Sequence, residues 1–315
     1  MDKNRHLVNR RLLAWRKWRW LALAVLLVGV GLLLRLGTVG QPPIHLNRWL
    51  PWVSPPTVTL YFPDSQGRFL VPVTRTVGSA GATAQAAVEE LLQGPLDKEE
   101  LSTPFPLGSR LSLFDFQEGV AQVHITTERP ESADLLDISR TLEMLARTIQ
   151  EFQDVESVQL LVNGSLLGDI SVTSPRSHSI YYTYDSYLVP TTNGYTSPQE
   201  AIAQYLIGPD PGSGLEGLPE DVRLLEYRFD ATRGLVYVNF TYTESVRRLA
   251  LSDVSRMRRT LIGIVTTLTD FDEVKAVMLD FQGHTRLGLG QCADLLRAPQ
   301  IRPKALNDEA VESRR

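Results

Sequence analysis

The chain has 315 residues, of which 43% are hydrophobic and 22% charged, a balance typical of globular proteins. Its formal net charge of −4 is unevenly placed, because residues 1–19 carry net +6 and the remainder therefore −10. Phosphate binding needs a basic surface, so the acidic remainder argues against nucleic acid as a partner. The single cysteine, Cys292, excludes an intramolecular disulfide and a metal site built on several cysteines.

The first predicted element is a membrane segment over residues 20–40. Its core, Trp20–Leu34, contains no charged residue, and Arg35 can reach back to the headgroups while the span continues to Gly40. The basic arm of residues 1–19 predicts a cytoplasmic N-terminus and an extracytoplasmic remainder. A cleavable signal peptide is the alternative, but no A-x-A site follows Leu34. We expect a single-pass anchor in the cell membrane, followed by a proline-rich spacer over residues 41–56.

The remainder contains two copies of one sequence pattern, over residues 57–175 and 176–290. Short motifs recur in the same order, and their spacings differ only by insertions of loop size. The matching pairs are Leu70-Val71-Pro72 with Leu188-Val189-Pro190, Gly94-Pro95 with Gly208-Pro209, Arg110-Leu111 with Arg223-Leu224, and Arg140-Thr141-Leu142 with Arg259-Thr260-Leu261. This self-similarity predicts two tandem modules with one fold.

Each copy predicts the same order of elements: two strands, a helix, two strands, a long helix and a final strand. The long helix carries one apolar face, through Ile138, Leu142, Leu145, Ile149 and Phe152 in the first copy. We therefore expect an α+β fold in which each module is a mainly antiparallel sheet with two helices packed on one face. The expected elements of the first copy are strands at 58–62, 69–73, 110–116, 120–125 and 158–163 and helices at 83–92 and 135–152; those of the second copy include helix 197–207 and strands 223–229 and 235–240.

Two segments depart from this pattern, at the start of the second copy and at the C-terminus. The start of the second copy, YYTYDSYLVP, departs from the first, so its opening hairpin is the less secure prediction. The C-terminal tail, residues 291–315, is charged and aperiodic after Ala298, and we expect it to be disordered there.

A search for catalytic and cofactor motifs predicts no catalytic, cofactor-binding or metal site. The chain has no HExxH, no GxSxG elbow and no Walker A loop. Gly288-x-Gly290-x-x-Ala293 matches the dinucleotide fingerprint formally, but too few residues follow it for a strand–helix–strand unit. The remaining candidates favour structural roles; they are the dispersed histidines (His6, His45, His124, His178, His284), the helical pair Glu89-Glu90, and Cys292.

Two sets of side chains leave alternatives open. The tyrosines Tyr181, Tyr182, Tyr184, Tyr187 and Tyr195 fit strand positions, with stacking on the sugars of a wall polymer as the alternative. The repeat-matched arginines fit ion pairs inside the fold, with acidic groups of a partner as the alternative; they are Arg110, Arg223, Arg140 and Arg259.

The repeated motifs resemble the GerMN domain, also called Germane, which occurs in tandem in the GerM family of sporulation and germination proteins. The landmarks that carry the resemblance are VTLYFPD (Val58–Asp64), LVPVTR (Leu70–Arg75), LLQGP (Leu91–Pro95), PLGSRL (Pro106–Leu111) and VNG (Val162–Gly164). The resemblance covers about residues 57–290. The GerM-type proteins are often lipoproteins, whereas this chain has a predicted transmembrane helix in place of the lipid-bearing cysteine.

The resemblance implies a non-enzymatic envelope protein. We expect a scaffold or assembly factor of sporulation or germination that contacts envelope or sporulation membrane proteins through sheet edges or helix faces, without a cofactor. A peptidoglycan-binding module is the alternative, supported only by the tyrosine-rich stretch. A wall hydrolase would require a catalytic cluster assembled from distant residues.

Overall fold

The computed structural model describes residues 56–78, 81–128, 137–172, 178–282 and 289–308. The predicted cytoplasmic arm, membrane segment and nearly all of the spacer lie outside these ranges. Among the described residues, no helix is long and apolar enough to cross a bilayer. The described residues belong to one compact unit.

The first module contains six strands and two helices within the described residues. The hairpin β1-β2 is antiparallel and forms a sheet of its own, and the other four strands form a second sheet in the order β3-β4-β5-β6. The elements are β1 (Thr57–Pro63), β2 (Leu70–Thr76), α2 (Ala84–Gln93), β3 (Arg110–Gln117), β4 (Val120–Thr126), α3 (Ile138–Gln150), β5 (Ser157–Val162) and β6 (Ser165–Ser171).

Within the described residues, the second module repeats this plan with one added helix; residues 283–288, which follow its last strand, lie outside those residues. Its hairpin is β7-β8, and its larger sheet has the order β11-β10-β9. A helix absent from the prediction, α5, precedes the long helix α6, because Asp253 ends the first helix and caps the second. The elements are β7 (His178–Tyr184), β8 (Tyr187–Tyr195), α4 (Pro198–Ile207), β9 (Leu224–Asp230), β10 (Leu235–Phe240), α5 (Glu244–Ser252), α6 (Val254–Leu268) and β11 (Ala276–Phe281).

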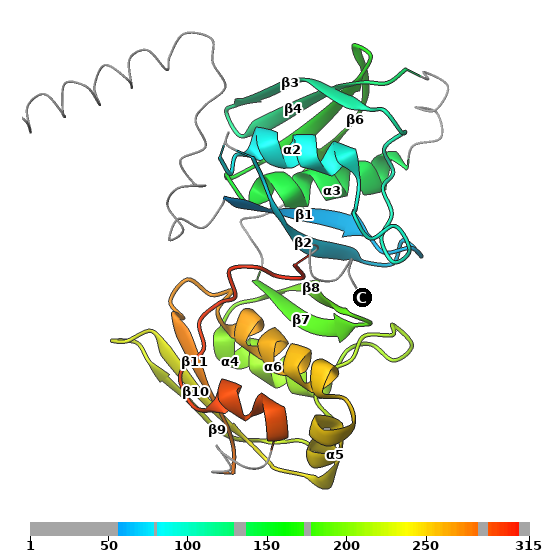
Figure 1. Cartoon of the computed structure of the whole chain (residues 1–315). Helices are drawn as coiled ribbons and strands as arrows, with labels where there is room; N and C mark the ends of the chain where they lie inside the picture. The colour runs from blue at the N-terminus through cyan, green and yellow to red at the C-terminus, as the bar shows by residue number, and fades with distance from the viewer. Residues whose placement is uncertain (1–55, 79–80, 129–136, 173–177, 283–288, 309–315) are drawn as a thin grey trace, which may run out of the picture. The chain divides into compact units, whose positions relative to one another are not determined.

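Each module is built of layers, with its helices between the hairpin and the larger sheet, as the upper half of Figure 1 shows for α2 and α3. The prediction of one sheet with both helices on one face is therefore wrong, although most strand pairs are antiparallel. The β4–α3–β5 segment explains the difference: a helical crossover returns the chain parallel, so β4 and β5 pair in parallel, as do β10 and β11. The hairpin then covers the other side of the helices.

The helices predicted over 83–92 and 197–207 are confirmed as α2 and α4. The side chains of Thr83 and Ser197 accept hydrogen bonds from the third helical amide of α2 and α4, at 3.1 and 3.2 Å. Both helices end at a glycine, Gly94 and Gly208, with φ of 81° and 92°. The helix predicted over 135–152 is α3; residues 135 and 136 lie outside the described ranges.

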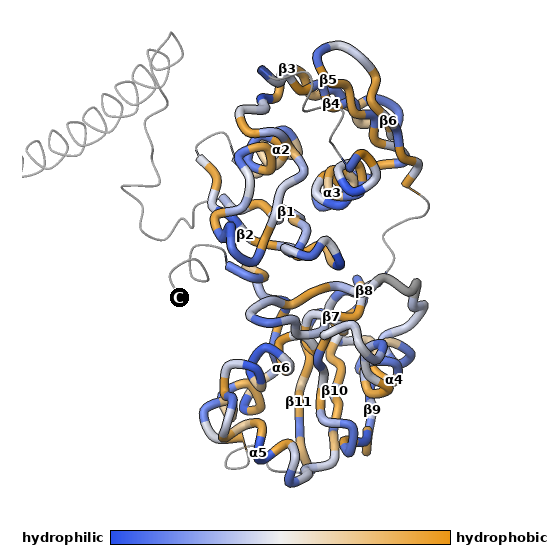
Figure 2. The backbone as a smooth tube through the Cα atoms, turned by 90° about the vertical axis from the view of Figure 1, so that its right-hand side faces the viewer, coloured by the Kyte–Doolittle hydropathy of each residue, from blue (hydrophilic) through white to orange (hydrophobic). Residues whose placement is uncertain are grey.

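Two hydrophobic clusters, one centred on each module, form the core. The apolar face predicted for the long helix is buried, with Leu142, Leu145 and Ile149 between 0% and 3% exposed. In α6 the matching Leu261, Ile264 and Leu268 are fully buried. Figure 2 shows the same bias in β10 and β11, which are mostly hydrophobic. Each module thus supplies most of its own core.

The prediction of disorder after Ala298 is wrong for residues 299–308. A short 3₁₀ helix, Gly290–Leu296, packs Cys292, Leu295 and Leu296 against the second core. The chain then pairs Gln300 with Val277 of β11 through two backbone hydrogen bonds of 2.8 Å. The charge of this segment and its lack of periodicity led to the prediction of disorder. The segment is ordered because it pairs with the edge strand of a sheet.

One ion pair fastens the 3₁₀ helix to α6 and predicts a pH effect. Arg258 donates to both carboxylate oxygens of Asp294 at 3.1 and 2.7 Å, and these bonds lower the pKa of Asp294. The stabilisation is therefore present above the ordinary aspartate pKa and is lost as the pH falls below it. Because the two side chains are 43% and 49% exposed, it amounts to at most about 1 kcal/mol.

We expect Asp294→Asn to raise hydrogen exchange in Gly290–Leu296 several-fold at neutral pH. In acid the wild type should lose the same stabilisation, so wild type and variant should converge in a thermal unfolding series once the pH falls below the lowered pKa of Asp294. A difference between them that is independent of pH would contradict this ion pair.

Candidate functional site

The two modules contact each other through their hairpins. Strand β2 lies beside β8, and Tyr187 and Val189 of β8 belong to the hydrophobic cluster of the first module. Matching positions in the two copies make matching contacts: the amide of Tyr61 donates to Thr148, and that of Tyr181 donates to Thr267, at 3.2 and 2.9 Å. In both modules a helix threonine thus satisfies an amide of the first hairpin strand.

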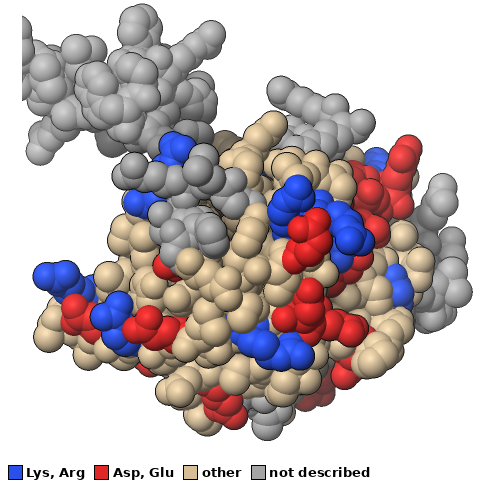
Figure 3. All heavy atoms as spheres, turned by 90° about the horizontal axis from the view of Figure 1, so that it is seen from below, with Lys and Arg blue, Asp and Glu red and all other residues tan. Residues whose placement is uncertain are grey.

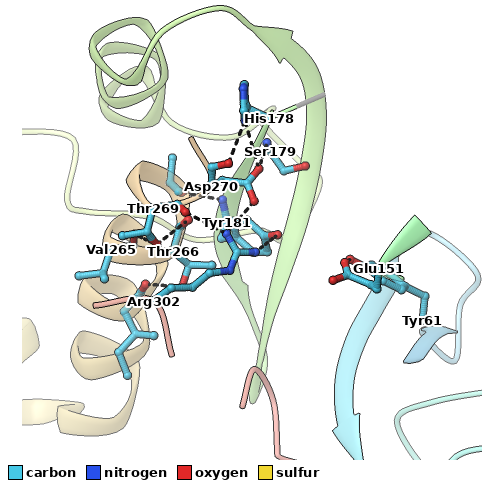
Figure 4. Close-up of polar contacts among 12 residues, drawn as sticks. Tyr61, Glu151, His178, Ser179, Tyr181, Val265, Thr266, Thr269, Asp270 and Arg302 are labelled. Atoms are coloured by element: carbon cyan, nitrogen blue, oxygen red, sulfur yellow. Dashed lines mark hydrogen bonds and ion pairs between the residues drawn. The ribbon is translucent and has the colours of Figure 1, made fainter. Parts of the chain in front are cut away.

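A polar cluster lies beside these contacts (Figure 4). Arg302 reaches Asp270 at 2.7 Å and donates to the hydroxyl of Tyr181 at 3.3 Å, while Asp270 also accepts from the amide of Ser179 at 3.0 Å. Asp270 is nearly buried, so both kinds of partner offset the cost of removing its charge from water. This cluster is a support for the second module's hairpin.

The first module's counterpart is Tyr61, whose hydroxyl donates to Glu151 at 2.9 Å. Burial first, and the nearby carboxylate second, raise the pKa of Tyr61; burial and Asp270 do the same for the pKa of Tyr181. Both phenols therefore stay protonated, as hydrogen-bonding groups rather than as acids. A polar cavity of about 210 Å³ lies between them, closed on one side by Arg302, Pro303 and Leu306.

The predicted internal pairing of the repeat arginines holds for Arg140 alone among the four. Its guanidinium pairs with Glu143 at 3.1 Å and donates to the carbonyl of Gly67, beside a second cavity of about 200 Å³. Arg223 donates to the backbone carbonyls of Glu220 and Val222. Arg110 is exposed, and the ion pairs of the described residues do not include it or Arg259.

The tyrosines of the second copy's hairpin lie on β7 and β8, and most of them are buried in the core. Tyr181, Tyr182, Tyr187 and Tyr195 are 9% exposed or less, and Tyr182 stacks on Tyr205 with ring centroids 5.0 Å apart. The half-buried Tyr184 packs on Phe69 and Arg68 of the first module. The faces of the four buried rings are unavailable to a sugar ring, which weakens the observation that supported wall-polymer binding.

The other sequence candidates lie apart from one another. His178 stacks on Phe271, Glu90 pairs with Arg75, Glu89 accepts from Gln85, and Cys292 is fully buried, which raises the pKa of its thiol. Gly290 begins the 3₁₀ helix rather than a strand–helix–strand unit. His6, His45, His284 and Gly288 lie outside the described residues. Within the described ranges, no group of three His, Cys, Asp or Glu side chains is placed to hold a metal.

The strongest candidate for contact with another protein lies on the first module's larger sheet, on the face turned away from its helices. Leu113, His124, Leu161 and Leu166 stand opposite one another on β3, β4, β5 and β6, and we call them the outer row. Leu113 and Leu166 are 52% and 59% exposed. The Nε2 atom of His124 is buried without a hydrogen-bond partner. An apolar row of this kind on a solvent face is typical of a contact surface.

The second module has polar residues at the three positions of this row that its described residues include. Glu226 and Asn239 stand opposite each other at the positions that match Leu113 and His124, and Asp280 matches Leu161. Asp280 accepts a hydrogen bond from Tyr237 at 3.0 Å. Two copies of one fold thus differ in the chemistry of one face, and the fold itself does not require the apolar residues.

Sequence reasoning missed the outer row because β6 was not predicted and strand faces were not compared between copies. The signal was present in the repeats, as a leucine in one copy aligned with an acid in the other. Figure 3, by contrast, shows acidic and basic side chains interspersed on the face that it displays, without a continuous basic area there.

Comparison with known proteins places this architecture in a family. The model of the Germane family, described as sporulation and spore germination, matches residues 59–168 and 175–286, more than half of the chain. No curated protein matches.

Among solved structures, the tandem GerMN domains of the sporulation protein GerM from Bacillus subtilis match with a TM-score of 0.55 at 21% identity, covering 81% of this chain and 99% of that one. The first GerMN domain of the same protein matches with a TM-score of 0.29 at 22% identity, covering 35% of this chain and 84% of that one. A putative lipoprotein from Clostridium perfringens gives 0.24 at 19% identity, covering 37% and 87%. With both of its modules matched by the family model, this chain belongs to the Germane family of sporulation and spore germination proteins.

Proposed function

We propose that this chain is a non-enzymatic scaffold of the cell envelope that acts in sporulation or spore germination. It holds an envelope or sporulation membrane protein against the first module, through the outer row. The observation that carries this proposal is the contrast between the two copies, because Leu113 and Leu161 of the outer row are matched by Glu226 and Asp280 in the second copy. Exposed apolar residues that the fold does not need are explained by a partner that covers them.

The scaffold is anchored by residues 20–40, with both modules outside the cytoplasm. The uncharged run Trp20–Leu34 and the net charge of +6 over residues 1–19 support this topology. A tag at each end of the chain tests it in intact cells: the C-terminal tag should be cleaved by external protease and the N-terminal tag should not. Protection of both tags would contradict the proposed topology.

The partner is a protein with an apolar contact surface, so a charge in the outer row should prevent its binding. We expect Leu166→Asp to reduce capture of the partner at least tenfold, since burying an unpaired carboxylate costs several kcal/mol. Leu166 is exposed, so its variant should keep the wild-type unfolding temperature within about 2 °C. Crosslinking of tagged full-length chain in sporulating and vegetative cells, followed by mass spectrometry, measures the capture.

Leu225→Asp is the matched control, because Leu225 is an exposed leucine, at 50%, on β9 of the other module. It should leave capture unchanged. Recovery of the same proteins with Leu166→Asp as with wild type would refute the outer row as the contact. Equal recovery from vegetative cells would refute a sporulation-specific role, and enrichment of wall fragments in place of proteins would favour wall binding.

A further inference from the structure

Strand β3 is the open edge of the first module's larger sheet. In the described residues it pairs with β4 on one side only. The opposite edge strand of the second module, β11, is joined by Gln300 of the chain itself. An edge strand with unpaired amides and carbonyls is a template for another strand unless charges or bends protect it.

The two faces of β3 have a symmetric pattern about its centre. Leu111 and Phe114 face the core, because they pair with Ile125 and Val123 of β4. Arg110, Leu113 and Asp115 face outward, opposite Thr126, His124 and Gln122. Ser112 is the extra residue of a bulge; its exposed side chain donates to the carbonyl of His124.

From Arg110 to Asp115, the residues that pair with β4 therefore have the order of faces outer, inner, outer, inner, outer, with the bulge at the centre. This order reads the same in both directions. When two such strands lie antiparallel about the midpoint between Ser112 and Leu113, Arg110 meets Asp115 on the outer face, Leu111 meets Phe114 on the core face, and the two bulges meet at the centre.

In the same register the charges are complementary. Arg110 of each copy stands opposite Asp115 of the other, which places two opposite-charge pairs at the ends of the strand pair. Leu111 stands opposite Phe114 on the core side. The arrangement is isologous, since the same patch is used on both copies, and it closes after two chains.

The matching edge of the second module cannot use this register. Arg223 and Arg228 occupy the positions of Arg110 and Asp115. A second-module edge would thus face its own copy with two pairs of like charges, and a mixed pair of edges would have one like-charge pair and one opposite-charge pair.

We infer that β3 pairs antiparallel with β3 of a second copy of this chain, joining two first-module sheets into one continuous sheet. This dimer does not depend on the outer row binding another protein. A strand pair by itself makes a small interface, so the dimer is weak in dilute solution and is favoured where two anchored chains share a membrane.

Co-expression of full-length chains that carry two different tags tests the inference, after extraction in a mild detergent. Capture of one tag should recover the other for wild type. Arg110→Asp alone places Asp opposite Asp, and Asp115→Arg alone places Arg opposite Arg, so each variant paired with itself should lose at least about tenfold of the recovery.

Mixing the two variants supplies the decisive outcome. A chain with Arg110→Asp meets a chain with Asp115→Arg as two opposite-charge pairs, so recovery should return to near the wild-type level. The double reversal in one chain should also restore it. Arg223→Asp is the matched control on the second module and should change nothing.

Three outcomes would overturn the inference. They are no recovery for wild type even at high expression, unchanged recovery for both single reversals, and loss in the single reversals without rescue on mixing. Circular dichroism of each variant guards against misfolding, and a variant that fails it is replaced by the milder pair Arg110→Glu and Asp115→Lys, read by the same capture.

Discussion

Replacing Gly263 by alanine is expected to lower the free energy of unfolding of the second module by about 2 kcal/mol. Gly263 lies in the middle of α6, where alanine normally stabilises a helix by about 1 kcal/mol. A Cβ atom there would stand 2.6 Å from the carbonyl oxygen of Tyr181 and 3.1 Å from a methyl of Leu188. The oxygen belongs to the β7 backbone and cannot rotate away, so the helix and the hairpin must separate.

The first module supports this interpretation. The residue of α3 that matches Gly263 is Met144, which is fully buried, so the same helix position holds a long side chain when the hairpin packs differently. Gly263→Met should therefore cost more than Gly263→Ala, about 3 kcal/mol or above. All five tryptophans precede residue 56, so far-UV circular dichroism in urea is the suitable probe.

Ser255→Ala, an exposed position of the same helix, provides the control and should change stability by less than about 0.5 kcal/mol. If Gly263→Ala were as stable as this control, the close approach of α6 to β7 would be incorrect. If Gly263→Met were tolerated as well as alanine, the packing difference between the two modules would be refuted.

The second large effect is expected at Asn307, which joins the two modules. Its side-chain amide donates to the carbonyls of Pro72 on β2 and Leu188 on β8, at 2.6 and 2.8 Å, and its oxygen accepts from the amide of Leu188 at 2.8 Å. Its φ is +52°, a left-handed conformation that asparagine tolerates better than most residues. The adjacent Leu306 also binds β2, because its backbone amide donates to the hydroxyl of Thr74 and its carbonyl accepts from that hydroxyl.

Asn307→Ala should free the segment 302–308 from the hairpins. Three hydrogen bonds are lost and the left-handed conformation becomes unfavourable, which together cost about 2 to 3 kcal/mol of local stability. Hydrogen exchange at the amide of Leu188 should accelerate on the order of 30- to 150-fold, as followed by mass spectrometry of peptides 187–190 and 302–308.

Two further variants separate the causes. Asn307→Gly keeps the left-handed backbone without the side chain, so its effect isolates the hydrogen bonds and should be most of the total. Lys304→Ala, an exposed residue of the same segment, should leave exchange at Leu188 unchanged. Exchange in Asn307→Ala equal to that of wild type would show that the segment does not hold the modules together.

The joined hairpins bear on function, because they make the tandem pair a single unit. Residues of the C-terminal segment contact both β2 and β8, and the first module's core includes side chains from β8. The outer row and the β3 edge lie on the larger sheet, which the hairpin contacts leave free. In the proposed scaffold, this arrangement places the contact surfaces on the first module's larger sheet, away from the inter-module join.

The sequence by itself determined the duplication, the type of nearly every element and the family resemblance. Periodicity located the buried faces of α3 and α6, through Leu142 and Leu261 and their neighbours, because a helix that packs on one side must repeat its apolar residues every three to four positions. Capping chemistry indicated Ser197, because a helix start leaves amides that a nearby side chain can accept from. These signals are local, so the sequence carries them directly.

Only the tertiary structure decided how those elements combine. Whether β4 and β5 pair in parallel, whether Asn307 lies between two hairpins, and whether Leu113 and Leu166 share a face all depend on contacts between residues far apart in the chain. The charged tail after Ala298 became ordered because a sheet edge and two hairpins were available to bind it. The physical reason is the same in each case. Strand pairing and the docking of a segment depend on residues elsewhere in the chain, which the local sequence does not identify.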